Sequence, residues 1–201
     1  MTKIKLCGLT ELCDIEAANS LTPEYIGFVF AKKSRRYVPP EKAAEFKERL
    51  ATGIRAVGVF VNEAPETVAG LLEDGIIDMA QLHGSEDEIY IRRMRELTGR
   101  PLIQAFSMDA AEDIRAAEES PADYILLDSG KGGTGNAFDW NLIKGIHRPF
   151  FLAGGLHAGN VAEAVRRLSP YGVDVSSGIE TDGKKDARKM AEFVRLIRQK
   201  L

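Results

Sequence analysis

The segment AVGVFVNEAPETVAGLLEDGIIDMAQL, residues 56–82, contains the pattern that decides the fold. It begins and ends with short apolar runs, Ala56–Val61 and Met79–Leu82, and Pro65 stands between them where the first turn of a helix tolerates proline. Neither run alternates with polar residues, which is typical of strands covered on both faces in a parallel sheet. The segment therefore predicts a strand–helix–strand unit whose two strands are parallel.

The same unit repeats along the whole chain. Short apolar runs recur about every 25 residues, with stretches of helical spacing between them. Eight of these runs are expected to be strands: Ile4–Cys7, Tyr25–Phe30, Ala56–Val61, Met79–Leu82, Leu102–Phe106, Tyr124–Leu127, Phe150–Ala153 and Val173–Val175. No two of them are joined by the two-residue turn of a β-hairpin, which again favours parallel strands.

Eight strand–helix units favour one α/β domain over residues 1–201, folded as a closed (β/α)8 barrel of the TIM type. A length of 201 residues is at the lower limit for this fold, so short loops and some reduced helices are expected. A doubly wound open sheet is the alternative that the pattern leaves.

Two features predict where helices begin and which way they face. Ser85 followed by Glu88 fits a capping box at the start of a helix. The last helix has the clearest apolar stripe, with i, i+3, i+4 and i+7 spacing, at Met190, Phe193, Val194 and Ile197. We expect this stripe to face the core.

Composition excludes several classes of protein. With 44% hydrophobic and 28% charged residues, the chain can bury a sizeable core and is not expected to be disordered. The net charge is −3 with interleaved signs, so no broad basic surface for nucleic acid is expected. The longest apolar stretches are far too short to cross a membrane. Two cysteines are too few for a disulfide framework and no secretory leader is recognisable, so we expect a cytoplasmic protein.

In a barrel of this type, residues at the carboxyl ends of the strands carry the chemistry. Cys7 ends the first expected strand, and Asp128 directly follows the sixth. Free cysteine is more often a small core residue, but a thiolate at the barrel mouth could accept a proton from carbon. Asp128 would then be its acid partner; the alternative is an N-cap or loop anchor. Cys13, inside the first helical stretch, is expected to be a core residue only.

Short segments that contain glycine follow the last two expected strands. Gly154-Gly155 and Ser177-Gly178 stand where this fold commonly binds phosphate through backbone N–H groups. Ordinary strand-to-helix turns would explain either pair alone, but both pairs together favour a phosphate site. A glycine loop at residues 132–135 could cover a ligand.

Other polar residues near strand ends are candidates for ligand contact. Arg35 and Arg36 follow the second strand; such pairs are usually solvated, yet arginine binds carboxylates in bidentate fashion, so one of them is expected to face the site. Gln81 lies in the fourth expected strand and His83 directly follows it, without a second His or acidic residue at metal-ligand spacing, so no metal site is expected. Asp174, inside the eighth strand, needs partners and is expected either to bind ligand or to serve the structure.

Blocks of sequence match those of a known family, in the family's order and over nearly the whole chain. They are KLCGLT (5–10), GFVF (27–30), SRRYV (34–38), GVFVN (58–62), QLHG (81–84), LD (127–128), GGTG (132–135), FDW (138–140), AGGL (153–156) and GVDVSSGIE (172–180). On these residues the chain resembles the phosphoribosylanthranilate isomerases of tryptophan biosynthesis.

The resemblance implies an Amadori rearrangement of N-(5-phosphoribosyl)anthranilate to 1-(2-carboxyphenylamino)-1-deoxyribulose 5-phosphate, without cofactor or metal. It implies that Cys7 is the general base and Asp128 the general acid, and that Arg36 lies near the anthranilate end of the substrate. It also implies that Gly154, Gly155, Ser177 and Gly178 belong to the two phosphate-holding loops. Gln81, His83 and Asp174 are further substrate-binding candidates, from their positions in or after the strands.

Two alternatives are weaker. The related isomerase of histidine synthesis should have an aspartate in place of Cys7 and a doubled half-barrel, and the sequence has neither. A barrel that only binds a phosphorylated ligand should lack one catalytic group, whereas Cys7 and Asp128 are both present. The expected partner is a small phosphorylated substrate, without nucleic acid or membrane. The sequence leaves open whether the protein is a monomer or a homodimer.

Overall fold

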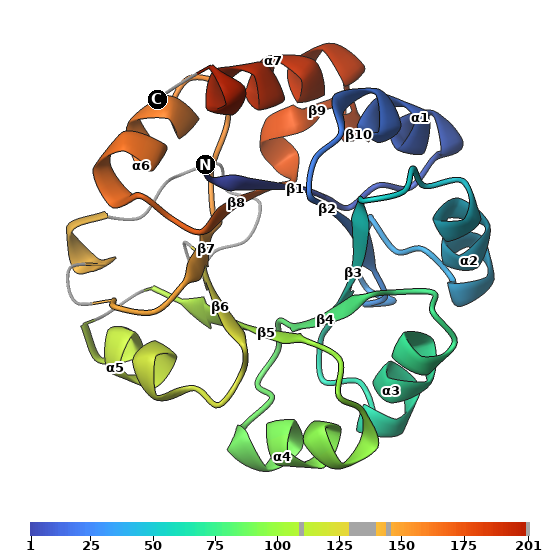
Figure 1. The fold of residues 1–201 in the computed structure, drawn as a ribbon, viewed down its shortest axis with the longest axis vertical. Helices are drawn as coiled ribbons and strands as arrows, with labels where there is room; N and C mark the ends of the chain where they lie inside the picture. Colours follow the sequence, from blue (N-terminus) through green and yellow to red (C-terminus); the bar gives the residue numbers. More distant parts are fainter. Residues whose placement is uncertain (109–110, 129–139, 144–145, 200–201) are drawn as a thin grey trace.

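The computed structural model describes residues 1–108, 111–128, 140–143 and 146–199. Its centre is a closed barrel of eight parallel strands in chain order, with helices around the outside (Figure 1). The strands are β1 (Lys3–Cys7), β2 (Tyr25–Val29), β3 (Arg55–Phe60), β4 (Met79–Leu82), β5 (Leu102–Ser107), β6 (Tyr124–Asp128), β7 (Phe150–Leu152) and β8 (Gly172–Val175). Because β8 pairs with β1, the (β/α)8 barrel is confirmed and the open sheet is excluded.

Helices connect the strands on the outside of the barrel. They are α1 (Leu12–Leu21), α2 (Pro40–Glu48), α3 (Pro65–Glu73), α4 (Glu88–Leu97), α5 (Ala111–Glu119), α6 (Val161–Leu168) and α7 (Ala187–Arg198). Between β6 and β7, the described residues form only the short 3₁₀ helix η1 (Trp140–Ile143). After β8 come a second 3₁₀ helix, η2 (Ser177–Ile179), and a small hairpin of β9 (Glu180–Thr181) and β10 (Lys184–Lys185). Within the described ranges, no helix has the length and apolar character to cross a membrane.

The barrel has one apolar cluster inside and another outside, because successive side chains of a strand point to opposite faces. Inside, the ring of Phe151 meets Tyr25, Tyr124 and Tyr171 edge-on, with centroid separations of 5.5, 5.9 and 5.3 Å. Outside, a larger cluster fills the space between the strands and the helices. Both faces of the sheet are therefore covered, which explains why the strands carry no regular polar alternation.

The start of α4 differs from the prediction. Its N-cap is Asp87, whose side chain accepts a hydrogen bond from the backbone N–H of Tyr90 at 2.9 Å. The capping box expected from Ser85 to Glu88 is therefore wrong. Ser85 instead donates to the side chain of Asn62 at 3.0 Å, and the aspartate next to the helix satisfies the free N–H in its place.

Cys13 is exposed on α1, so the prediction that it is a core residue is wrong. The residues that α1 buries are Asp14, Ile15 and Ala18, which share one face of the helix. Cys13 lies outside this face.

The apolar stripe of α7 is confirmed, because Met190, Phe193, Val194 and Ile197 are all buried. We expect Phe193→Ala to lower the free energy of unfolding by about 3 to 5 kcal/mol, because it removes a fully buried ring and leaves a cavity. Glu192→Ala, on the exposed side of the same helix, should change it by less than about 0.5 kcal/mol. Urea unfolding measures both; equal effects would contradict the assigned face.

Candidate active site

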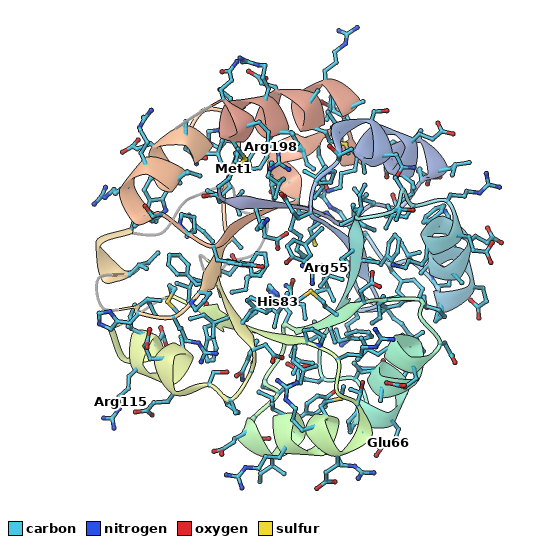
Figure 2. All side chains as sticks on the ribbon, in the orientation of Figure 1. Met1, Arg55, Glu66, His83, Arg115 and Arg198 are labelled. Atoms are coloured by element: carbon cyan, nitrogen blue, oxygen red, sulfur yellow. The ribbon has the colours of Figure 1, made fainter. Side chains whose placement is uncertain are left out.

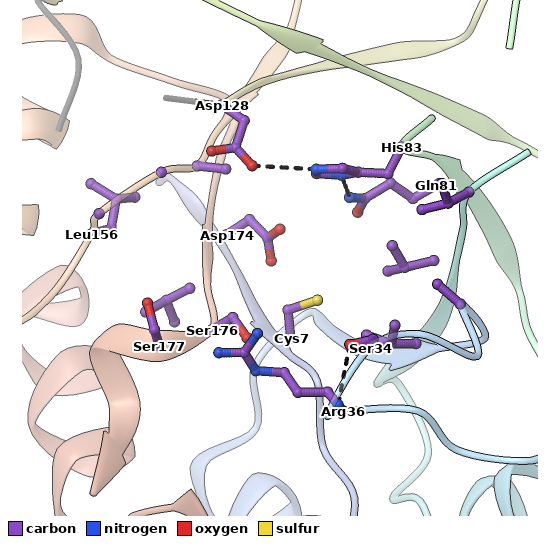
Figure 3. Close-up of a pocket in the computed structure, with 18 residues that line it drawn as sticks. Cys7, Ser34, Arg36, Gln81, His83, Asp128, Leu156, Asp174, Ser176 and Ser177 are labelled. Atoms are coloured by element: carbon purple, nitrogen blue, oxygen red, sulfur yellow. Dashed lines mark hydrogen bonds and ion pairs between the residues drawn. The ribbon is translucent and has the colours of Figure 1, made fainter. Parts of the chain in front are cut away.

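A cavity of about 310 Å³ opens at the carboxyl ends of the strands. All the predicted site residues except Gly178 line it: Cys7, Arg36, Gln81, His83, Asp128, Gly154, Gly155, Asp174 and Ser177. Val29, Val59 and Val61 contribute an apolar wall. Cys7 and Asp128 project into the cavity from opposite walls (Figure 3). The fold therefore brings nine residues from six strands or the loops after them into one cavity.

Cys7 is the last residue of β1, and its side chain is almost fully buried. The neighbouring strand makes room for it with a glycine, since a Cβ on Gly27 would lie 2.7 Å from the Cys7 sulfur. Burial raises the pKa of the thiol and so does the charge of Asp174, whereas the positive charges of Lys5 and Lys185 lower it. The pKa of Cys7 lies above the ordinary thiol value as a result.

Lys5 and Asp174 form an ion pair inside the barrel. They are directly paired in the register of β1 and β8, and Lys5 Nζ lies 3.0 Å from Asp174 Oδ1. Burial lowers the pKa of Lys5, but the charges of Asp174 and Cys7 more than offset this effect, so the pKa is raised. Asp174 therefore has a structural partner while it also faces the cavity.

Asp128, at the end of β6, lies beside the imidazole of His83. His83 Nε2 is 3.4 Å from Asp128 Oδ2, and Nδ1 is 2.8 Å from the side-chain nitrogen of Gln81. Viewed down the barrel, His83 lies within the ring of strands, whereas Glu66 and Arg115 lie on the outer helices (Figure 2). Gln81 and His83, predicted as substrate contacts, thus also contact each other and, through His83, Asp128.

Glu180 holds the guanidinium of Arg36 from one side. Arg36 Nε donates to Oε1 at 2.7 Å and Nη2 donates to Oε2 at 3.0 Å. A guanidinium has five N–H donors, so this pairing leaves the outer edge for a ligand. Gly8, with φ of +75°, permits the side chain to lie in this position, because a Cβ there would be 2.5 Å from Arg36 Cδ.

Two further cations contact Glu180. Arg35 Nη2 and Lys185 Nζ each lie 2.7 Å from one of its carboxylate oxygens. The Arg35 side chain is 59% exposed, as predicted for a surface residue, but it is paired and not only solvated. Lys185 is buried and also donates to the backbone oxygen of Ser176 at 2.9 Å. Glu180 is therefore the centre of a charged cluster beside the cavity.

The pKa values of this cluster follow from burial and pairing. Burial raises the pKa of Glu180, but hydrogen bonds from Arg36 and Lys185 outweigh it and hold the pKa below its ordinary value. For Lys185 burial is the larger effect, and the pKa is lowered despite the carboxylate. Glu180 is thus a stable anion among cations at neutral pH.

The two glycine loops are adjacent at the cavity mouth. Gly154 and Gly155 have φ of +77° and +64°, a backbone conformation that favours glycine. Gly178 does not line the cavity: a Cβ there would lie 1.9 Å from the carbonyl oxygen of Leu156, so glycine lets the loop after β8 pack directly on the loop after β7. The glycine loop at 132–135 lies outside the described residues.

Some residues of the site received no role from the sequence. Lys5 carried a usable signal, because a lysine inside a strand covered on both faces needs a partner. Glu180 and Lys185 carried none, since only the β9–β10 hairpin brings them back to Arg36. In the described part of the chain, no group of three or more His, Cys, Asp or Glu is placed to hold a metal ion.

The pairing of Glu180 predicts a pH-dependent contribution to stability. Because its folded pKa is lowered, the stabilisation is complete above the ordinary value of 4.5 and is lost as the pH falls through the folded value. We expect wild type to lose more unfolding free energy than Glu180→Gln between about pH 7 and about pH 3. Chemical denaturation at both pH values measures the difference. Equal losses of unfolding free energy in the two proteins would show that the ionised Glu180 adds no stability.

Comparison with known proteins identifies the family of this chain. The family model described as N-(5'phosphoribosyl)anthranilate (PRA) isomerase matches residues 4–196. The N-(5'-phosphoribosyl)anthranilate isomerase of Endomicrobium trichonymphae is 44% identical over 98% of this chain and 99% of its own length. A crystal structure of phosphoribosyl anthranilate isomerase in complex with reduced 1-(o-carboxyphenylamino)-1-deoxyribulose 5-phosphate has a TM-score of 0.86, with 35% identity and 97% coverage of both chains.

A structure of monomers of the dimeric enzyme from Thermotoga maritima has a TM-score of 0.84, with 35% identity and 98% coverage of both chains. Full-length identity well above 30%, a family model spanning most of the chain and the same barrel all agree. The chain belongs to the N-(5'-phosphoribosyl)anthranilate isomerase family.

Proposed function

We propose that this isomerase converts N-(5-phosphoribosyl)anthranilate to 1-(2-carboxyphenylamino)-1-deoxyribulose 5-phosphate in tryptophan biosynthesis, with Cys7 as general base and Asp128 as general acid. The observation that carries these roles is the placement of a thiol and a carboxyl group on opposite walls of one cavity (Figure 3). A sugar between them would have the acid on one side and the base on the other. An assay of the purified chain with freshly prepared substrate tests the activity.

The proposed reaction begins with ring opening. Asp128 protonates the furanose ring oxygen, the C1'–O bond breaks, and the amine nitrogen supplies the electron pair that forms the iminium. The iminium carbon acidifies the proton on C2', and the Cys7 thiolate removes it to give an enolamine. Tautomerisation then gives the aminoketose. Each positioned proton transfer contributes roughly 10²- to 10⁴-fold to the rate.

His83 and Gln81 are suited to form hydrogen bonds that match both protonation states of Asp128. As placed, the Gln81 side-chain N–H donates to His83 Nδ1, so that His83 Nε2 carries its proton toward the Asp128 carboxylate. The side-chain oxygen of Gln81 is buried and has no hydrogen-bond partner among the described residues. Turning this amide over would let that oxygen accept from Nδ1–H and make Nε2 the acceptor for a protonated Asp128. The flipped orientation suits the protonated Asp128 before proton donation, and the present orientation suits the carboxylate that remains afterwards.

Arg36 is the proposed partner of the anthranilate carboxylate. Its outer edge offers two parallel donors, the geometry that carboxylates prefer, and Glu180 fixes its plane. The phosphate group is proposed to bind between Gly154-Gly155 and Ser177, where closely packed loops present backbone to the cavity. Asp174 lines the same cavity and is proposed to face the substrate as well.

We propose that the reaction needs no cofactor, since acid, base and two anion-binding groups supply each step above. It is formally an intramolecular oxidation and reduction, because C1 is reduced while C2 is oxidised. A base thiol must stay reduced, and Cys7 and Cys13 are both free cysteines, which supports a reducing compartment such as the cytoplasm. A monomer and a homodimer are both compatible with a cavity built from one chain.

We expect Cys7→Ala and Asp128→Ala each to lower kcat by more than about 10²-fold with the fold intact, because each removes a proton-transfer group. Cys13→Ala, which changes the exposed cysteine, is the matched control and should leave kcat unchanged. Steady-state kinetics and circular dichroism measure activity and folding. Near-normal kcat in Cys7→Ala would refute its role as the base.

Arg36→Lys should lower kcat/KM by an amount that corresponds to a loss of about 1.5 to 3 kcal/mol in transition-state stabilisation. Lysine keeps the charge but loses the planar pair of donors. Arg35→Lys is the control, since Arg35 is exposed and an exposed ion pair contributes little. Kinetics of both variants decide between the two arginines. Greater damage from Arg35→Lys would place the carboxylate on Arg35.

A further inference from the structure

The base proposed above has a physical difficulty. Cys7 is almost fully buried, and a neighbouring carboxylate adds to the cost of ionising it. The net pKa of Cys7 is raised even though nearby positive charges already oppose these two effects. Without a positive charge close to the sulfur, the thiolate that the proposed reaction needs would be less stable still.

Lys5 is placed to supply that charge. It precedes Cys7 by two residues on β1, so both side chains point to the interior of the barrel. Its side chain has no exposure to solvent, and its positive charge lowers the pKa of the neighbouring Cys7 thiol. A lysine so deeply buried gains nothing from water, which makes its charge effective at short range.

Asp174 adds to the stabilisation of the charge on Lys5. The carboxylate lies 3.0 Å from Lys5 Nζ and raises its pKa against the effect of burial. The price is that Asp174 also repels a negative charge on Cys7. Lys5 and Asp174 thus have opposite effects on the thiol, although they stabilise each other.

We propose that Lys5 is a positioning residue for catalysis, whose buried ammonium, held by Asp174 across the β1–β8 pair, stabilises the thiolate of Cys7. The inference rests on the proposed role of Cys7 as base. Lys185 provides a second positive charge, with a smaller effect on the same thiol. The other charged or titratable groups that line the cavity are Arg36, His83 and Asp128.

The test titrates Cys7 directly, in a Cys13→Ser background so that only one thiol absorbs and reacts. The probes are thiolate absorbance against pH and the rate of alkylation by iodoacetamide. We expect Lys5→Met to move the titration midpoint up by about one pH unit or more and to slow alkylation at pH 7 about tenfold. Asp174→Asn should move the midpoint down, because it removes a negative charge beside the sulfur.

Lys3→Met is the matched control. Lys3 lies on the same strand and loses the same charge, but its side chain is 40% exposed and pairs with Glu24, so the titration of Cys7 should not change. Because Lys5→Met leaves Asp174 buried without its partner, it is paired with the double variant Lys5→Met/Asp174→Asn, which leaves no lone charge. The midpoint of the double variant should lie above that of Asp174→Asn alone.

These outcomes separate electrostatic support from a structural role. If Lys5 only stabilised the barrel, its removal would lower the unfolding temperature and leave the thiol midpoint unchanged in both backgrounds, which would overturn the proposal. The acid-side midpoint of the kcat/KM profile should follow the thiol titration in each variant. Since the titration does not depend on turnover, it tests Lys5 even if Cys7→Ala shows that Cys7 is not the base.

Discussion

Closure of the barrel between β1 and β8 is the constraint on which the rest of the structure depends. The register of this pair places Lys5 beside Asp174, two residues that are 169 positions apart in the chain. It also places the end of β1, with Cys7, beside the loop after β8, with Ser176 and Ser177. The proposed base, the buried ion pair and the proposed phosphate loop are therefore neighbours because of one strand pairing.

Each of the cations beside the cavity has a carboxylate partner, whether it is fully buried, as Lys5 is, or half-buried, as Arg36 is. Lys5 pairs with Asp174, and Lys185 and Arg36 pair with Glu180. An unpaired charge at these positions would be costly, because water is largely excluded. The pairing also orients the groups: Glu180 fixes the plane of Arg36, and Asp174 holds the ammonium of Lys5 inside the barrel. The same contacts thus serve both stability and the proposed chemistry.

Glycines make the close approaches in this site possible. Gly27 gives the Cys7 sulfur its space, and Gly178 allows the loops after β7 and β8 to touch backbone to backbone. Gly8, directly after β1, leaves room for the side chain of Arg36. A side chain at any of these positions would separate groups that must lie within a few ångströms of one another.

The sequence by itself determined the order of strands and helices, the barrel class and most of the cavity lining. This was possible because apolar runs such as Ala56–Val61 indicate strands that are covered on both faces. In addition, the strands of a parallel barrel bring their carboxyl ends together whatever their exact register. It failed where a local signal had two solutions: Asp87 replaced Ser85 as the cap of α4, and the buried face of α1 excluded Cys13.

Only the tertiary structure decided the partners of the charged residues. A lysine in β1 and an aspartate in β8 each require a counterion, but sequence does not say that they are adjacent until the barrel closes. Glu180 meets Arg36 and Lys185 only because the β9–β10 hairpin folds back beside the loop after β2. Local sequence patterns indicate which residues are buried. An ion pair between distant segments depends on the positions of both segments, and the packing of the whole chain fixes those positions.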